Sequence, residues 1–88
     1  MLRITEYRED SNTLRLRLDG TISQSSLAEL ENAYSRHRAS QEIIVLDMGG
    51  VVFMNSEVAS RIVRLRSEGL RLINCSPFIE TLLNTIAA

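Results

Sequence analysis

Apolar and polar residues alternate along the first quarter of the chain. Leucine occupies every second position of segment 14–18, and a period of two is typical of a β-strand that buries one face. Segment 2–4 begins the same way, and the polar residues 9–12 between the two segments predict a turn. We therefore expect an antiparallel hairpin in which Arg15 and Arg17 point away from the leucine face.

Three later segments have the spacing of amphipathic helices. A capping-box pattern, a serine followed three residues later by a glutamate, predicts that the first helix covers 26–38. The second begins near Val58, and Gly69 is expected to end it. The pair 76–77, Ser-Pro, predicts the start of a third helix. The predicted apolar face of this last helix comprises Phe78, Ile79, Leu82, Leu83 and Ile86.

Continuous apolar runs between the helices predict the remaining strands. Segment 43–46 is apolar throughout, which is typical of a central strand buried on both faces. We expect the glycine pair 49–50 to break this strand before the apolar stretch 51–54, and segment 70–73 to form a short strand. The order ββαβαβα predicts a single α/β domain over 1–88, with a four-stranded mixed sheet and three helices.

Charge and cysteine content limit the possible partners and the cellular location. Ten basic residues balance eleven acidic ones, for a net charge of −1, which gives no general attraction to nucleic acid or to an anionic membrane. The apolar runs are far shorter than the roughly 20 residues that a membrane-spanning helix needs. The chain has one cysteine and no apolar leader. We expect a cytoplasmic protein without membrane insertion.

No catalytic, metal or cofactor site can be assembled from these residue types. The chain has one histidine, His37, and three aspartates, and no credible Ser-His-Asp, Cys-His or paired-carboxylate arrangement can be assembled from them. The glycine pair 49–50 lacks the spacing and the lysine of a phosphate loop. We expect His37 and Cys75 to be structural, and the protein to be neither an enzyme nor a metal or cofactor carrier.

Segment 43–65, IIVLDMGGVVFMNSEVASRIVRL, carries a family resemblance. It resembles the signature of STAS domains, the module of bacterial anti-sigma factor antagonists and of sulphate transporter tails. Asp47 matches the end of the signature's buried strand, and 55–58 occupies the place of its Asp-Ser-Ser-Gly motif. Upstream, Gly20 matches a glycine that follows a strand of the family. The resemblance covers nearly the whole chain and implies the STAS fold.

The resemblance also implies a function. In classical members the first serine of the motif is phosphorylated by a kinase that is itself the anti-sigma factor, and Ser56 matches that serine. The chain departs from the motif at Asn55, Glu57 and Val58, where the family has Asp, Ser and Gly. The implied function is regulation of bacterial signalling or transcription, and a serine-kinase anti-sigma factor is the implied partner.

Physical reasoning leaves two roles open for Ser56. It can cap the following helix and lie in an interface, or it can accept a phosphoryl group, which a helix N-terminus favours. The predicted partner-binding residues are Asn55, Ser56, Glu57, Arg61 and Arg64. We expect Glu57 and Glu68 to form ion pairs with the arginines of their own helix, and the partner surface facing these arginines to be acidic.

Two further possibilities concern ligand and assembly. The chain could sense a small molecule such as a nucleotide, or serve as an accessory subunit of a lipid-transport system, because some STAS domains are associated with such systems. The predicted first strand is a candidate sheet edge through which a homodimer could form. Asp47 has no second carboxylate near it in sequence, so we expect it to fix a loop by accepting backbone N–H groups.

Overall fold

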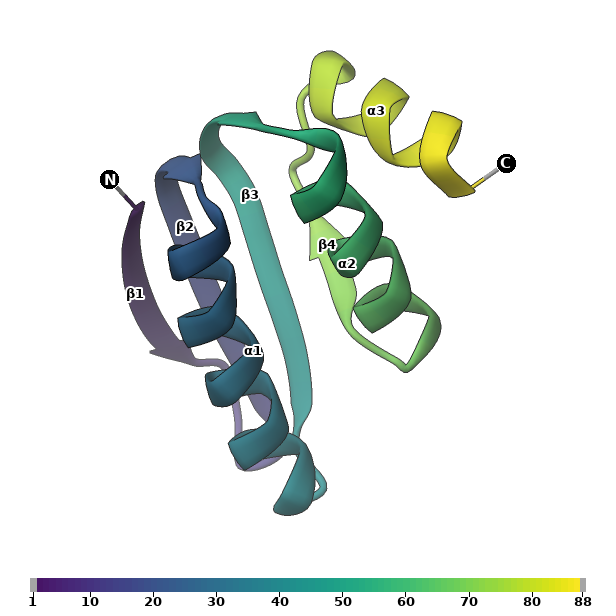
Figure 1. Ribbon diagram of the computed structural model, residues 1–88. Helices are drawn as coiled ribbons and strands as arrows, with labels where there is room; N and C mark the ends of the chain where they lie inside the picture. The colour runs from purple at the N-terminus through teal and green to yellow at the C-terminus, as the bar shows by residue number, and fades with distance from the viewer. Residues whose placement is uncertain (1, 88) are drawn as a thin grey trace.

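The computed structural model describes residues 2–87. The chain folds into a four-stranded mixed sheet with three helices, which confirms the predicted order ββαβαβα (Figure 1). The strands are β1 (Leu2–Arg8), β2 (Thr13–Ile22), β3 (Ile43–Met54) and β4 (Arg71–Ile73). The helices are α1 (Gln24–Ala39), α2 (Ser56–Ser67) and α3 (Pro77–Ala87).

The sheet combines one antiparallel pair with two parallel pairs. β1 and β2 form the expected antiparallel hairpin, with Ile4 opposite Leu18. β2 pairs in parallel with β3, and β3 pairs in parallel with β4, so the strand order is β1-β2-β3-β4. The two edges are therefore β1, as predicted, and the three-residue β4.

One hydrophobic core lies between the helices and one face of the sheet. The alternate leucines of β2 are buried together with Ile44 and Leu46 of β3. All three helices contribute to the same cluster, α3 through Ile79 and Leu83. Figure 1 shows α1 and α2 side by side across the sheet. The other face carries Arg15 and Arg17, as predicted, and no helix of residues 2–87 buries its apolar side there.

The glycine pair 49–50 does not break β3, contrary to the prediction. The strand runs through both glycines to Met54, and its pairing with β2 shifts register in this region, between Arg17 and Asp19. A Cβ atom on Gly50 would lie 2.8 Å from the Leu18 carbonyl oxygen of β2. Glycine therefore allows the two backbones to approach closely at an irregularity of the ladder, rather than ending the strand.

The helix boundaries differ from the prediction at one end of α1. The capping box at 26–29 is not the start of the helix. α1 begins at Gln24, and the Ser23 side chain caps it by accepting a hydrogen bond from the Ser26 N–H at 3.3 Å. β2 extends to Ile22, so the chain enters the helix directly after the strand. Two other predicted signals are confirmed: Gly69 has φ of 118° just after α2, and the Ser76 hydroxyl caps α3.

Candidate functional site

The site begins where β3 passes into α2. The Asn55 side chain caps the helix by accepting a hydrogen bond from the Val58 N–H at 2.9 Å. Ser56 is the first residue of the helix, so its predicted role as the cap is wrong. β3 ends one residue before Asn55, whose extended backbone (φ −87°, ψ 176°) is the conformation that a cap adopts.

The first three predicted partner-binding residues are all exposed. Asn55, Ser56 and Glu57 lie on the surface, and Val58, in the place of the motif's glycine, is buried beneath them. Ser56 lies where the free N–H groups and the positive end of the α2 dipole favour an anion. Glu57 is acidic in the same first turn, and its carboxylate accepts a hydrogen bond from the Gln24 amide of α1.

The charged residues of α2 pair with α1 instead of with one another. Arg61 donates three hydrogen bonds to the Glu31 carboxylate, the shortest at 3.0 Å. Farther along, Arg38 of α1 lies 2.7 Å from the Glu68 carboxylate. The predicted ion pairs within α2 are therefore wrong, because the neighbouring helix offers partners across the gap. Arg64 is exposed and takes part in none of the ion pairs found within residues 2–87.

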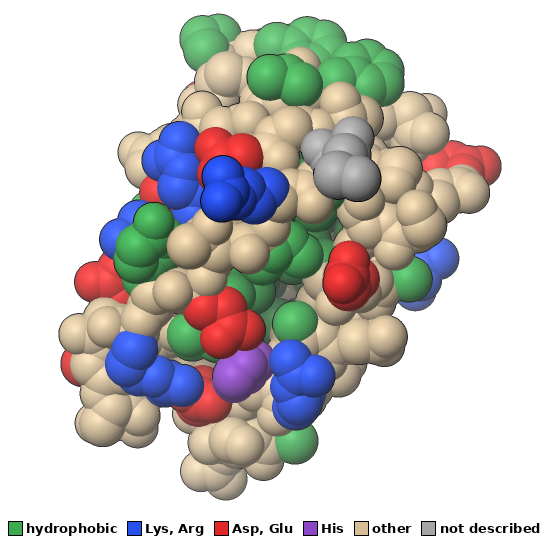
Figure 2. Space-filling view, turned by 90° about the vertical axis from the view of Figure 1, so that its left-hand side faces the viewer, with side chains coloured by type: hydrophobic (Ala, Val, Ile, Leu, Met, Phe, Trp, Pro, Cys, Tyr) green, Lys and Arg blue, Asp and Glu red, His purple; other side chains and the backbone are tan. Residues whose placement is uncertain are grey.

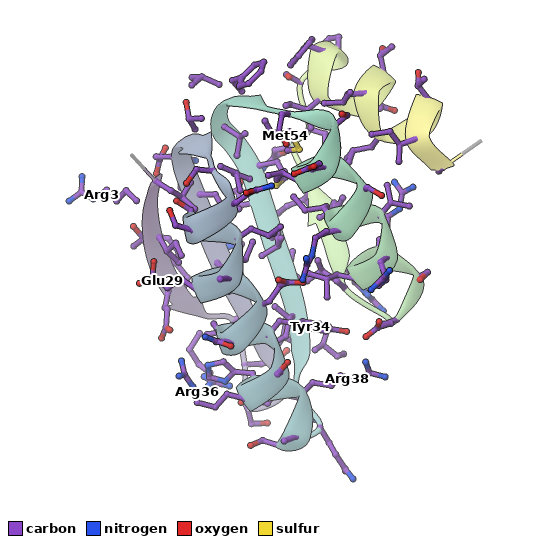
Figure 3. All side chains as sticks on the ribbon, viewed as in Figure 1. Arg3, Glu29, Tyr34, Arg36, Arg38 and Met54 are labelled. Atoms are coloured by element: carbon purple, nitrogen blue, oxygen red, sulfur yellow. The ribbon has the colours of Figure 1, made fainter. Side chains whose placement is uncertain are left out.

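A groove of about 510 Å³ lies between the N-terminal halves of α1 and α2. The buried side chains of Leu27 and Val58 lie at its base, and Glu31, Glu57 and Arg61 lie along it. Figure 3 shows Tyr34 and Arg38 reaching from α1 toward the lower end of α2. There the Tyr34 hydroxyl lies 3.4 Å from the Glu68 carbonyl oxygen. The predicted site residues Glu57 and Arg61 both contact α1, Glu57 through Gln24 and Arg61 through Glu31.

An exposed apolar tip adjoins the start of α2. It consists of Val52 and Phe53 at the end of β3 and Phe78 in the first turn of α3, with exposed fractions of 70%, 50% and 53%. The two phenylalanine rings stack with their centroids 6.3 Å apart. Figure 2 shows hydrophobic side chains gathered at this end of the molecule. Phe78 is therefore a surface residue, and its predicted place on the buried face of α3 is wrong.

Asp47 lies at the middle of β3, not at the end of a strand as the resemblance implied, and apart from the tip. It is 2% exposed, and its carboxylate accepts hydrogen bonds from the Asn74 side chain at 3.1 Å and the Gly49 N–H at 3.0 Å. Arg15 donates a third bond at 3.1 Å, and Arg17 lies 3.8 Å away. The bonds from Asn74 and Gly49, followed by the arginines, lower the pKa of Asp47. Only one of these donors is a backbone group, so the predicted loop-fixing role is met in part.

The positions of Gly20, His37 and Cys75 indicate structural roles for these three residues. Gly20 has φ of 110° in β2, a conformation that favours glycine, at a second register shift of the ladder. His37 is half-buried and its Nδ1 lies 2.8 Å from the Glu42 carboxylate. Burial raises the pKa of the Cys75 thiol, which disfavours the nucleophilic thiolate. Residues 2–87 contain no cluster of three metal-binding side chains and no helix long and apolar enough to span a membrane.

The sequence did not point to the tip or to the bonds between α1 and α2. Phe53 and Phe78 are 25 positions apart and both fit apolar patterns, so only their positions in the fold reveal that they meet on the surface. The one available signal was the run of four apolar residues before Asn55, of which only Val51 and Met54 are buried. Glu31 and Glu68 carried no signal that would distinguish them from other surface acids.

Comparisons with known proteins place this geometry in a family. The chain is similar to the anti-sigma factor antagonist SpoIIAA in its unphosphorylated form, with a TM-score of 0.73 and 18% identity over 93% of this chain and 82% of that one. It is also similar to a structure described as Mglu, with a TM-score of 0.57 and 22% identity over 77% of this chain and 18% of that one. A search of curated proteins found no match. The sequence model of the STAS domain matches residues 5–86, and the chain therefore belongs to the STAS domain family.

Proposed function

We propose that the protein acts by docking onto a partner protein through one continuous surface. This docking surface comprises the apolar tip (Val52, Phe53 and Phe78), the helix start (Asn55, Ser56 and Glu57) and the arginines Arg61 and Arg64. The observation that carries the proposal is the exposed, stacked Phe53–Phe78 pair beside an exposed helix start. Aromatic side chains flanked by polar groups are typical of protein interfaces, where they contribute much of the binding energy.

The structural likeness to SpoIIAA suggests the kind of partner. SpoIIAA is described as an anti-sigma factor antagonist in its unphosphorylated form, which implies that it also has a phosphorylated one. By analogy, the partner of this chain is an anti-sigma factor with serine-kinase activity, and the process is bacterial signalling or transcription in the cytoplasm. Arg64, which is exposed and free to pair, favours an acidic patch on the partner.

Phosphorylation of Ser56 would oppose this docking. A phosphoserine carries close to two negative charges, about −1.5 to −2 at pH 7. Placed beside Phe53 and Glu57, it would have to lose its hydration against an apolar contact and next to a like charge. In the free protein, the same phosphate would be well accommodated by the N–H groups that begin α2. Modification of Ser56 would therefore release the partner without unfolding the domain.

The corresponding experiment compares three proteins: wild type, Ser56→Ala and Ser56→Asp. The partner is captured from the native cell with wild-type protein, identified and purified, and its affinity for each protein is measured by calorimetry. Ser56→Ala should bind like wild type, and Ser56→Asp at least about tenfold more weakly, the effect expected of a charge placed in an interface. Phosphopeptide analysis of the same cells shows whether Ser56 is modified.

Equal affinities for the Ala and Asp variants would rule out the switch. Retained binding after Phe53→Ser would rule out the docking surface itself.

The small-molecule alternative finds little support in the groove between α1 and α2. Its volume of about 510 Å³ would admit a nucleotide, but Glu31 and Glu57 line it and its one arginine, Arg61, already pairs with Glu31. Two carboxylates repel a polyphosphate. No rise in melting temperature is expected with ATP or GTP at millimolar concentration, and a reproducible rise would favour this alternative.

A further inference from the structure

The exposed large hydrophobic side chains of residues 2–87 fall into two groups of three. One group is the apolar tip. The other consists of Tyr7 on β1, Ile43 on β3 and Ile73 on β4. All three belong to the set of alternate residues that points away from the core, because their neighbours Ile44 and Leu72 pack into it. They therefore lie on the helix-free face of the sheet, a different surface from the one proposed above.

A bare face is unusual for strands that pair in parallel. β2, β3 and β4 form two parallel pairs, and parallel sheets commonly have both faces covered. Here α1, α2 and α3 all pack on one side. The other side leaves Ile43 and Ile73 partly exposed. Ile73 lies beside Asp47, four residues along β3 from Ile43, so a partner that covers both must extend along the strands.

The centre of this face is a fixed arrangement of charges. Arg15 and Arg17 lie on β2 beside Val45 and Asp47 of β3. The buried Asp47 carboxylate accepts a hydrogen bond from Arg15 at 3.1 Å and lies 3.8 Å from Arg17. The Arg15 guanidinium also lies over the Tyr7 ring, 4.6 Å from its centroid. These contacts hold the guanidinium groups in place while both arginine side chains stay partly exposed.

The charge of this face is positive at its edges. Arg3 on β1 and Arg71 on β4 also point to this side, and neither joins an ion pair within residues 2–87. Arg3 extends away from the ribbon in Figure 3. Against these four arginines the same face has the carboxylates of Asp19 and Asp47, and Glu9 of the turn binds Arg15. Arginine is therefore in excess on this face. The clearest example that is unpaired within the described residues is Arg71, two residues before Ile73.

We propose that the helix-free face is a second docking site, for a protein segment that carries acidic side chains interspersed with aliphatic ones. The acidic groups pair with Arg71 and the free N–H donors of Arg15 and Arg17, while aliphatic groups cover Ile43 and Ile73. A second copy of the chain fits poorly, because two copies would bring like-charged arginines together. Single-stranded nucleic acid is also disfavoured, since stacking needs more aromatic rings than Tyr7 alone.

A peptide selection tests this site and does not require the partner to be identified first. A random dodecapeptide display library is selected on wild-type protein, and the enriched consensus peptide is synthesised and titrated against folded variants. The expected consensus has two or more Asp or Glu together with Leu, Ile or Val. Its affinity should fall at least about tenfold in Arg71→Glu, and should also fall in Tyr7→Ser, which changes the opposite edge. Arg36→Glu, the same charge reversal on α1, and Arg64→Glu on the docking surface should leave it unchanged.

Several results would overturn the proposal. These are no enrichment, a consensus without acidic residues, or equal losses of affinity in Arg36→Glu and Arg71→Glu. If sedimentation shows that the protein self-associates, and Arg71→Glu abolishes this association, the face is assigned to a dimer instead. Binding of an oligothymidine probe with similar sensitivity to Arg71→Glu would assign it to nucleic acid.

Discussion

Asn55 and Ser56 are adjacent polar residues, yet only the Asn55 side chain caps α2. Both residue types are good helix caps, so the sequence Asn-Ser-Glu could not decide between them. The decision depends on where β3 ends, which the pairing of β3 with β2 determines. Ser56 is consequently free of a capping role and accessible on the surface, as the proposed phosphorylation requires.

The two residues should therefore differ in their effect on stability. Asn55→Ala removes the acceptor for the Val58 N–H and should lower the free energy of unfolding by about 1 kcal/mol. Ser56→Ala should change it by less than about 0.5 kcal/mol, as expected of a surface substitution. Urea unfolding measures both, and Asn55→Asp should retain the stability because it keeps the capping oxygen. A larger loss in Ser56→Ala than in Asn55→Ala would contradict the assignment of the cap.

Asp47 should make the stability of the domain depend on pH. Because its pKa is lower in the folded state, its contribution is present above its ordinary pKa of about 4 and is lost as the pH falls through the folded value. Asp47→Asn should be less stable than wild type by about 1–3 kcal/mol at pH 7, with a difference that narrows below pH 4. Urea unfolding at pH 7 and at pH 3 tests this. Glu42 and Asp10 also have lowered pKa values. Because wild type and Asp47→Asn both contain these groups, they do not change the difference in stability between the two proteins. A constant difference would show that charge is not the cause.

Among the secondary-structure elements, β3 shows best what the sequence could and could not predict. Its apolar run correctly indicated a central strand. The predicted burial of that run on both faces is wrong, because Ile43 is exposed on the helix-free side of the sheet. Its two glycines were wrongly interpreted as its end. Glycine is common both at breaks and where two backbones approach closely, and only the neighbouring β2 distinguishes these cases. The faces of α1 and α2 followed from their periodicity, whereas the pairing of Arg61 with Glu31 requires knowing that the two helices are neighbours.

The two glycines should tolerate alanine unequally. In Gly50→Ala the new methyl group would meet the Leu18 carbonyl oxygen and the Asp19 carboxylate of β2, which should cost about 1–3 kcal/mol of stability. In Gly49→Ala the nearest atom is a side-chain oxygen of Asp47 at 3.2 Å, so a smaller loss is expected. Urea unfolding of the pair provides a matched comparison. Equal losses of stability in the two variants would show that the close approach of the β2 and β3 backbones is not the reason why glycine occupies position 50.

At the scale of the whole molecule, the fold was predictable and its surfaces were not. Periods of two and of 3.6, together with turn residues, defined the order ββαβαβα and hence the sheet. The apolar tip depends on how α3 lies relative to the end of β3, which is a tertiary arrangement. For this reason Phe78 was expected in the core and is found on the surface beside Phe53.

The tip can be tested as part of the docking surface. The double variant Phe53→Ser/Phe78→Ser should fold normally, because both rings are half exposed, and should bind the captured partner at least about tenfold more weakly. Ile73→Ser, an exposed apolar side chain on the sheet, is the matched control and should bind it normally. Circular dichroism checks the fold and calorimetry the affinity. Similar losses in both proteins would indicate a general effect of surface hydrophobicity.

The placement of the two tyrosines gives the molecule its own optical reporters. The chain has no tryptophan, so its near-ultraviolet emission comes from Tyr7 and Tyr34. Tyr34 is buried between the helices, whereas Tyr7 lies open to solvent under the Arg15 guanidinium. In a Tyr34→Phe protein, the remaining emission would come from the bare side of the sheet alone. Occupancy there could then be followed without any attached dye.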